Sequence, residues 1–491
     1  MATLAKFGFG EFLRQTSLDS YLARSGPRDD AHVREPLPVR VRLLLEALGP
    51  TFVKGGQVMS TRPDLIPPEW IAEFRKLQTE VPPDEWDGED GVRAVLEEEL
   101  GEGLGTAFQS IDETPIAAAS MAQVHRAVLI DGRPVVVKIL RPGIREKMAA
   151  DLELMRIFAR LTQSHFENLG FDAEAVIDEF SKQLRRETDL TIEAHSTQRM
   201  RTDFEDNPGI SFPRIEMGLS TRSVLVMEEA KGTLLSRLDL TALSDEQRGK
   251  IIRNGADMVF KQTLVIGFFH ADPHPGNIFV GEDQSLIFID CGMTGLVDPG
   301  TIQQLARITH GALEGELNTV IRVAISIADA DPAIADDRSF RSDVWHFVDR
   351  FHGGTLSSLS MGSLLNEFFT LLRKHRLRCP SDIVYLMKAL TTIEGVAEDI
   401  APSFDLVTYV RPYVEQLVRQ QYSSGTLRRR MRKTIIAYGD FIEELPREVS
   451  DLLRSLRHNR LSINLEHRGI REVTDEIERA SVNVAWFLFI A

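Results

Sequence analysis

Residues 267–280 have the sequence GFFHADPHPGNIFV, and residues 286–292 have the sequence LIFIDCG. Asn277 lies five positions after Asp272, and Asp290 lies 18 positions after it (290 minus 272). Two short apolar strands, 278–280 and 286–289, are predicted to form a hairpin that brings Asn277 and Asp290 side by side. Phosphoryl transfer needs one carboxylate that orients the nucleophile and further oxygen ligands for magnesium. The spacing supplies both kinds of group, and it predicts magnesium-nucleotide chemistry centred on Asp272, Asn277 and Asp290.

A zinc site built from His270, Asp272 and His274 is the alternative interpretation, because zinc takes three or four such ligands. An ordinary polar loop is a second alternative. The combination of an Asp-x4-Asn spacing with a later Asp-x-Gly after an apolar strand favours phosphoryl chemistry over both.

A lysine on a predicted strand is the second candidate group. Segments 123–130 and 135–139 flank Asp131-Gly132, which is a strong hairpin signal, and Lys138 lies on the second strand. A lysine there would reach the α- and β-phosphates of ATP, oriented by a carboxylate on a following helix. Glu187, Asp189 and Glu193 are the available carboxylates. An isolated solvated lysine and an acidic helix face are the alternatives.

The expected phosphate loop contains alanine instead of glycine. Residues 117–120 are Ala117, Ala118, Ala119 and Ser120, and no glycine occurs between Gly105 and Gly132. Because alanine avoids positive φ, this loop should be stiffer than the glycine-rich loop of ordinary kinases. We therefore expect the nucleotide to be held in a different way, and we do not expect a conventional protein kinase.

The order of predicted elements indicates an α+β, bilobal fold with extra N-terminal helices and a helical C-terminal lobe. Together with the candidate phosphoryl-transfer groups, this plan favours a protein-kinase-like fold. Segments 210–215 and 223–227 should close the small sheet, and the chain should pass between lobes near Glu228–Gly232, where Met227 and Glu228 would contact the nucleotide. Ser244 and Gln247 form a capping-box pattern ahead of a helix that reaches about Val265. The predicted divisions are an N-terminal segment 1–36, a helical extension 37–110, an N-lobe with inserted helices 111–232, a C-lobe 233–410, a helical extension 411–479 and an apolar end 480–491.

Composition limits the function classes. The 491 residues are 43% hydrophobic and 26% charged, which is typical of a globular chain. The formal net charge of -16 argues against nucleic acid as a main partner. Two cysteines, Cys291 and Cys379, exclude a disulfide framework and fit a reducing compartment.

The last twelve residues, 480–491, are too few to cross a bilayer, which takes about 20 apolar residues. We expect them to begin a transmembrane helix; an interfacial anchor and a terminal helix docked on the core are the alternatives. The basic cluster Arg428-Arg429-Arg430-Met431-Arg432-Lys433 would suit anionic headgroups, or a solvated helix face. Residues 1–15 have the pattern of an amphipathic helix.

Four motifs together resemble the UbiB family of atypical protein-kinase-like proteins, over about residues 35–410. They are Lys54-Gly55-Gly56-Gln57, Ala117-Ala118-Ala119-Ser120, Glu187-Thr188-Asp189, and His270 to Asn277 with Asp290-Cys291-Gly292. The resemblance implies that the alanine segment binds ATP or ADP, that Lys138 pairs with Glu193, that Asn277 and Asp290 bind Mg²⁺, and that Asp272 is catalytic. It also implies a regulatory role for Lys54, Gln57, Glu187 and Asp189, with the Lys54–Gln57 segment lying over the site and blocking a protein substrate.

The function implied by this resemblance is an ATPase-like activity that supports ubiquinone biosynthesis on the cytoplasmic face of an inner membrane. The implied partners are membrane lipid or a lipid quinone precursor, and quinone-biosynthesis proteins. A small-molecule phosphotransferase of the aminoglycoside-kinase or choline-kinase type, and a nucleotide-sensing scaffold without turnover, are the competing functions.

Overall fold

The computed structural model describes residues 35–60, 62, 66–77, 91–101, 103–118, 121–168, 173–352, 361–377, 379–401 and 409. All of these lie in the first of two compact units, which spans residues 1–417. The predictions for residues 1–15, 428–433 and 480–491 lie outside the described residues. Within the described ranges, no helix is both long enough and apolar enough to cross a bilayer.

Three short helices form the N-terminal extension: α4 (Leu37–Leu48), α5 (Pro50–Ser60) and α6 (Pro68–Phe74). Proline near the start of each helix suits a position whose N–H has no partner within the helix. Trp70 and Phe74 of α6 are buried in a core shared with Phe180 and Leu184 of a later helix. The extension therefore shares a hydrophobic core with α10.

The first sheet is antiparallel, in the order β1-β2-β3-β5. Its strands are β1 (Phe108–Ala118), β2 (Ala122–Leu129), β3 (Pro134–Leu140) and β5 (Val224–Glu228). The predicted hairpin at Asp131-Gly132 is confirmed by the β2–β3 pairing. Strand β1 was missed, because most of its side chains are exposed and its pairing is irregular.

Two helices precede this sheet, α7 (Val92–Leu100) and α8 (Gly103–Ala107). Leu96 of α7 is fully buried in the same core as Val137 and Val226 of the sheet. Residues 92–110, which we predicted to belong to the helical extension, thus supply a packed helix and the first three residues of the edge strand β1.

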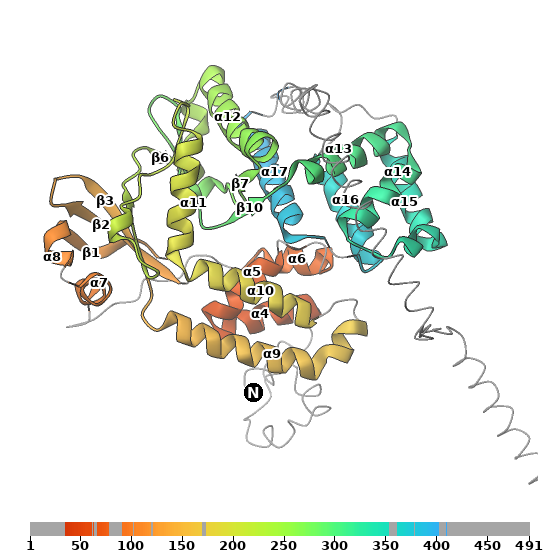
Figure 1. Cartoon of the computed structure of the whole chain (residues 1–491), viewed down its shortest axis with the longest axis horizontal. Coiled ribbons are helices and arrows are strands. Elements are labelled where there is room, and N and C mark those ends of the chain that lie inside the picture. Colours follow the sequence, from red (N-terminus) through yellow and green to blue (C-terminus); the bar gives the residue numbers. More distant parts are fainter. Residues whose placement is uncertain are drawn as a thin grey trace, which may run out of the picture. The chain divides into compact units, whose positions relative to one another are not determined.

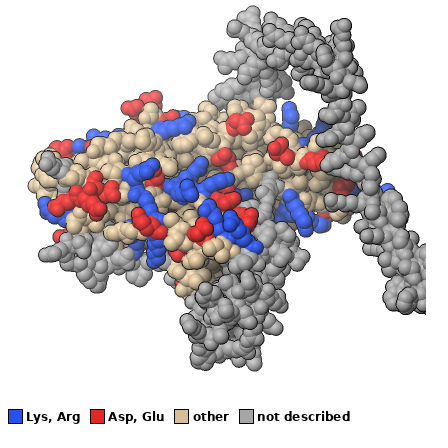
Figure 2. Space-filling view, turned by 60° about the horizontal axis from the view of Figure 1, so that its bottom comes forward, with Lys and Arg blue, Asp and Glu red and all other residues tan. Residues whose placement is uncertain are grey.

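The opposite face of the first sheet carries three inserted helices, α9 (Ile144–Asn168), α10 (Ala173–Glu187) and α11 (Leu190–Asp203). Figure 1 shows α9, α10 and α4 stacked together, while α11 stands between the first sheet and the strands β7 and β10. On the face shown in Figure 2, Lys and Arg side chains are interspersed with Asp and Glu side chains.

The second sheet has the order β4-β9-β8-β6, and β7 pairs with β10 beside it. The strands are β4 (Ile210–Ser211), β6 (Thr233–Leu234), β7 (Phe268–His270), β8 (Ile278–Val280), β9 (Leu286–Phe288) and β10 (Thr294–Leu296). The prediction that residues 210–215 close the first sheet was wrong for β4, which pairs in parallel with β9. The reason is packing: Phe212 stacks on Phe288 with ring centroids 5.6 Å apart, inside the core of the second sheet. An isolated bridge between Ile215 and Met227 connects this segment to the first sheet.

Helices make up most of the remaining described chain. They are α12 (Asp245–Phe260), the π-helix η7 (Lys261–Ile266), α13 (Pro299–Glu314), α14 (Leu317–Ile327), α15 (Arg338–Phe351), α16 (Met361–Lys374) and α17 (Ser381–Ile400). Short 3-10 turns lie at η4 (Met217–Leu219), η5 (Leu235–Arg237), η6 (Leu240–Ala242), η8 (Pro275–Asn277) and η9 (Pro332–Asp336). The Ser244–Gln247 capping box is confirmed, and the helix it starts changes to π-helix before Val265.

Candidate nucleotide site

The β8–β9 hairpin holds the first two predicted site residues together. Ile278 pairs with Phe288, and the N–H of Ile289 donates to the carbonyl of Asn277 at 3.0 Å. Asn277 and Asp290 therefore leave the same end of the hairpin, and both line a cavity of about 950 Å³. The juxtaposition predicted from the spacing is present.

The loop that carries Asp272 is fixed by hydrogen bonds within buried surroundings. The N–H of His270 donates to Oε1 of Gln262 at 2.9 Å, and Nδ1 of His270 accepts the N–H of Asp272 at 3.1 Å. Burial lowers the pKa of His270, so its ring is neutral. His270 therefore orients the Asp272 backbone.

The zinc alternative fails for the described residues. Nδ1 of His274 accepts the N–H of Gly276, and no group of three or more His, Cys, Asp or Glu side chains in the described ranges is placed to hold a metal ion. A kinase-type magnesium site differs, because a carboxylate, an amide oxygen and the phosphates of the nucleotide supply its ligands.

Of the three candidate carboxylates, Glu193 is the one that forms an ion pair with Lys138 on β3. Its Nζ donates to both oxygens of Glu193, at 3.0 and 2.8 Å, and lies 4.0 Å from Oδ1 of Asp290. Burial opposes the charge of Lys138, but the carboxylates of Asp290 and Glu193 outweigh it and raise its pKa above the ordinary value. Lys138 is therefore an ammonium held at the cavity wall.

Asp189 acts on this pair through the helix that carries Glu193. Its carboxylate caps α11 by accepting the N–H of Thr191 at 3.1 Å, and it also pairs with Nε of Arg222 at 3.2 Å. The cap starts α11 at Leu190, one turn before Glu193, and so helps to set the direction from which Glu193 enters the site.

The extension helix α5 brings Lys54 to the same cavity. Its Nζ lies 2.8 Å from Oε2 of Glu187, and Nε2 of Gln57 donates to the carbonyl of Leu77 at 3.3 Å. Burial opposes the charge of Lys54, but its pKa is raised, first by Glu187 and then by Asp290 and Asp272. Lys54 and Gln57 both line the cavity, as the resemblance implied for this segment.

The glycines between them permit this placement without bending α5. A Cβ on Gly56 would lie 2.3 Å from Cδ1 of Leu77, and one on Gly55 would lie 3.3 Å from the Phe180 ring. Helix α5 runs unbroken from Pro50 to Ser60. The glycines therefore serve close packing rather than a kink.

The predicted nucleotide contacts on the first sheet fall partly outside the described residues. Ala117 and Ala118 belong to β1, so the expected loop is shorter than predicted, and Ala119 and Ser120 are not among the described residues. Met121 and Ala122 line the cavity.

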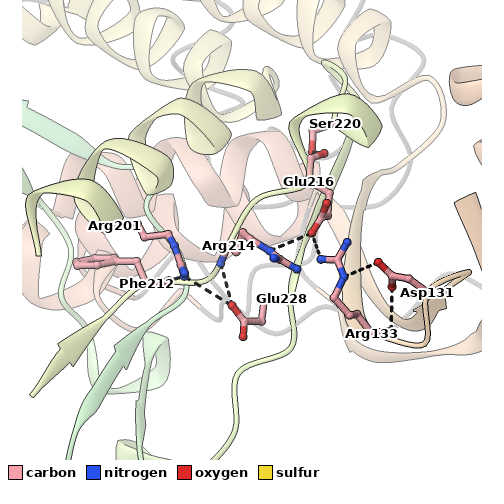
Figure 3. A network of polar contacts seen from close by, with 8 residues as sticks. All are labelled: Asp131, Arg133, Arg201, Phe212, Arg214, Glu216, Ser220 and Glu228. Atoms are coloured by element: carbon pink, nitrogen blue, oxygen red, sulfur yellow. Dashed lines mark hydrogen bonds and ion pairs between the residues drawn. The ribbon is translucent and has the colours of Figure 1, made fainter. Parts of the chain in front are cut away.

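Met227 and Glu228 end β5 without lining the cavity, among the residues that the structure describes. Met227 is buried in the core. Glu228 belongs to the polar network in Figure 3, where its Oε2 accepts the N–H of Arg214 at 3.2 Å and lies 3.7 Å from Nη1 of Arg201. Glu216 continues the network to Arg214 and Arg133. This network ties the end of β5 to α11 and to the β2–β3 turn.

Lys388 of α17 is a site residue that the sequence reasoning missed. Its Nζ lies 2.9 Å from Oδ1 of Asp272, and it lines the cavity. The available signal was that Lys388 is the one basic residue in the 20-residue sequence of α17.

Among the described residues, the ion pairs leave Asp290 without an ammonium in direct contact. Glu193, Glu187 and Asp272 each have a lysine within 2.9 Å, whereas Asp290 lies 4.0 Å from Lys138. The positive charge of Lys138 lowers the pKa of Asp290, and the N–H of Gly292 donates to its Oδ1. An ionised carboxylate beside an amide oxygen is the donor chemistry that Mg²⁺ prefers, so Asp290 and Asn277 fit the ion.

The site combines two carboxylates, a lysine on a strand, a glutamate on a helix that pairs with this lysine, and a β-hairpin that carries Asn and Asp. These features define a mixed α+β, kinase-like protein, and such a fold implies a nucleotide site. The model of the ABC1 atypical kinase-like domain matches residues 76–324, and that of the UbiB helical domain matches residues 344–405. The chain belongs to the ABC1/UbiB family of atypical kinase-like proteins.

Relatives extend over most of the chain. A protein of Azotobacter vinelandii named "Probable protein kinase UbiB" is 34% identical over 396 residues, covering 79% of this chain and 73% of its own length. A Synechocystis protein named "Uncharacterized protein sll1770" is 31% identical over 421 residues, covering 85% of this chain and 71% of its own length. Among solved structures, the Rv3197–erythromycin complex from Mycobacterium tuberculosis is 22% identical with a TM-score of 0.45, covering 64% of this chain and 83% of that one.

Proposed function

We propose that this protein is an atypical, Mg²⁺-dependent ATPase of the kinase-like class, with a cleft between two lobes. The observation that carries the proposal is that Lys138, Asp272, Asn277 and Asp290 converge on one cavity, where Asp290 is not in direct contact with a described lysine and so can serve a metal ion. Asp290 and Asn277 would hold Mg²⁺, which neutralises phosphate charge when bound. Lys138, oriented by Glu193, binds the phosphates, and Asp272 orients the attacking oxygen.

The position of the N-terminal extension favours water or a small molecule, rather than a protein, as the acceptor of the phosphoryl group. Lys54 and Gln57 line the cavity beside Asp272, and Lys54 is anchored on Glu187 of α10. A protein segment entering along this side would have to displace α5, whose Val58 and Met59 are buried in the core shared with α10. Hydrolysis of ATP, with its energy used on a lipid precursor or a biosynthetic complex, fits this geometry better than protein phosphorylation.

The test is phosphate release from ATP by the purified protein with Mg²⁺. Asp290→Asn should lower kcat about 10²- to 10³-fold, because it removes a charge that acts on the transferring phosphoryl group. Glu282→Gln, an equal change at the exposed turn of the same hairpin, is the control and should leave turnover unchanged. Equal turnover in Asp290→Asn and the wild type would reject the proposal. A phosphorylated small-molecule product would favour a phosphotransferase, and a nucleotide-dependent rise in Tm without phosphate release would favour a scaffold.

We further propose that the activity supports ubiquinone or another isoprenoid quinone pathway at the cytoplasmic face of an inner membrane. The support is membership in a family whose relatives include proteins named UbiB. Deletion of the encoding gene should lower quinone and raise a precursor, with rescue by the wild type and not by Asp290→Asn. Unchanged pools would separate the ATPase from quinone synthesis.

Membrane attachment is tested separately with the whole chain. The basic cluster Arg428-Arg429-Arg430-Met431-Arg432-Lys433 and the apolar residues 480–491 support attachment to anionic membranes and contact with a lipid precursor. Flotation with anionic liposomes should weaken when the five charges of the cluster are neutralised. Undiminished flotation would leave the apolar end as the anchor.

A further inference from the structure

Asp272 is paired with a lysine from outside the matched kinase-like domain. Lys388 lies in α17, within the region that matches the UbiB helical domain, and its Nζ is 2.9 Å from Oδ1 of Asp272. The side chains are 24% and 34% exposed, and both residues line the cavity.

One face of α17 fixes the direction in which Lys388 points. Ser381, Tyr385 and Lys388 are four and three residues apart and so share that face. The hydroxyl of Ser381 donates to Oε1 of Glu179 at 2.7 Å, and the buried hydroxyl of Tyr385 donates to Oε1 of Gln183 at 3.2 Å. Both acceptors lie on α10, so two hydrogen bonds set the rotation of α17 one and two turns before Lys388.

The extension reinforces this attachment. Nη1 of Arg62 lies 3.2 Å from Oε1 of Glu179 and donates to the hydroxyl of Ser381 at 3.3 Å. In Figure 1, α17 extends from α12 toward α6, beside β10.

Helix α17 also packs against the residues that precede Asp272, the other member of the ion pair. Leu386 and Ala389 of α17 pack in a buried cluster with Phe269 and Ala271, the residues that lead into Asp272. Helix α17 therefore supports the backbone before Asp272 and also supplies the ammonium that pairs with its carboxylate. Both halves of the ion pair depend on one packed interface.

We propose that Lys388 is a positioning residue that holds the Asp272 carboxylate in the orientation required for catalysis, so that the helical domain completes the nucleotide site. The inference rests on the proposed function, because it takes Asp272 as the group that orients the attacking oxygen. An aspartate at a cavity wall has several accessible rotamers, and a charge-assisted hydrogen bond of this length selects one. The ammonium also offsets part of the negative charge that Asp272 and Asp290 bring to the cavity.

The first experiment compares Lys388→Met and Lys388→Arg with the wild type in Mg²⁺-dependent ATP hydrolysis. Lys388→Met should lower kcat about 10- to 100-fold, as expected for a misplaced catalytic group, while the KM for ATP and the Kd for ADP change less than about twofold. Lys388→Arg keeps the charge and should recover most of the lost turnover. A parallel loss of kcat and nucleotide affinity, or an unchanged kcat in Lys388→Met, would overturn the inference.

Chemical rescue tests the charge on a single folded preparation. Lys388→Cys should have the low kcat of Lys388→Met, and alkylation with 2-bromoethylamine restores an ammonium at nearly the original length. The two native cysteines are buried, and burial raises the pKa of the Cys291 thiol, so the wild type treated in parallel should not change. Recovery of kcat after complete alkylation of the introduced thiol supports the inference, and failure of both alkylation and Lys388→Arg to restore turnover contradicts it.

The Asp290→Asn variant separates this inference from the proposed function. If Asp290→Asn is inactive while Lys388→Met is fully active, the ATPase assignment is supported and the positioning role of Lys388 is rejected. If Asp290→Asn retains wild-type turnover, the proposed function falls first.

Discussion

Two lysine–glutamate pairs line the same cavity, and they differ in their surroundings. Lys138 contacts both oxygens of Glu193, whose side chain is 5% exposed, whereas Lys54 contacts one oxygen of Glu187, whose side chain is 22% exposed. The first pair joins β3 to α11 inside the kinase-like domain, and the second joins the extension to α10. A buried bidentate pair fixes geometry, while a more solvated pair contributes little free energy. We infer that Glu193 fixes the position of Lys138 and that packing, more than the Lys54 ion pair, holds the extension at the cavity.

Replacing the glutamate of each pair in turn should give the largest difference in kcat between the two pairs. Glu193→Gln leaves Lys138 attracted mainly to Asp290, 4.0 Å away, and should lower the kcat of ATP hydrolysis about 10- to 100-fold through misplacement of the ammonium. Glu187→Gln, the matched control, should change kcat less than about threefold. Equal losses in the two variants would show that the pairs do not differ in function.

Filling the space beside Gly56 tests whether packing positions the extension. Gly56→Val places side-chain atoms where Leu77 and Leu45 already lie, with contacts of 2.3 and 2.9 Å from the Cβ alone. The free energy of unfolding, measured in urea, should fall by about 1–3 kcal/mol.

Gly395→Ala is the control for this change, since a Cβ on Gly395 of α17 meets no atom within 4 Å. It should raise stability by up to about 1 kcal/mol through helix propensity. A Gly56→Val protein as stable as the wild type would show that α5 is not tightly packed against Leu77 and Leu45.

A double-mutant cycle on Lys54 and Glu187 should give the smallest effect. The coupling free energy between Lys54→Met and Glu187→Gln, taken from urea unfolding of the four proteins, should lie below about 1 kcal/mol because both side chains are partly exposed. A coupling of several kcal/mol would mean that the ion pair itself fixes the extension.

Local patterns predicted much of the site correctly. The Asp131-Gly132 turn, the β8–β9 hairpin and the Ser244 cap each depend on residues close together in sequence, whose turn and capping preferences act over a few positions. The hairpin alone placed Asn277 beside Asp290. These features were predictable because their hydrogen bonds close within short segments.

Pairings between segments that are distant in sequence could not be predicted as well from local patterns. Strand β1 has mostly exposed side chains and an irregular register, so it lacks the alternation that marks a strand. Strand β4 joined the second sheet because Phe212 packs on Phe288, 76 positions later (288 minus 212), a contact that no local pattern encodes.

The sequence by itself determined the types and order of the candidate groups, because the Asp272, Asn277 and Asp290 spacing and the strand lysine can be read from short segments. Magnesium-nucleotide binding is the chemistry that we propose for them. The tertiary structure decided which charged side chains form ion pairs. Lys138 pairs with Glu193 and not with Glu187 or Asp189, and Glu187 pairs with Lys54. Lys388 pairs with Asp272. The physical reason is that ion pairing depends on distances of a few ångströms. Here those distances are set by α5, α10, α11 and α17 packing together, and residues 116 positions apart (388 minus 272) become neighbours only when the core forms.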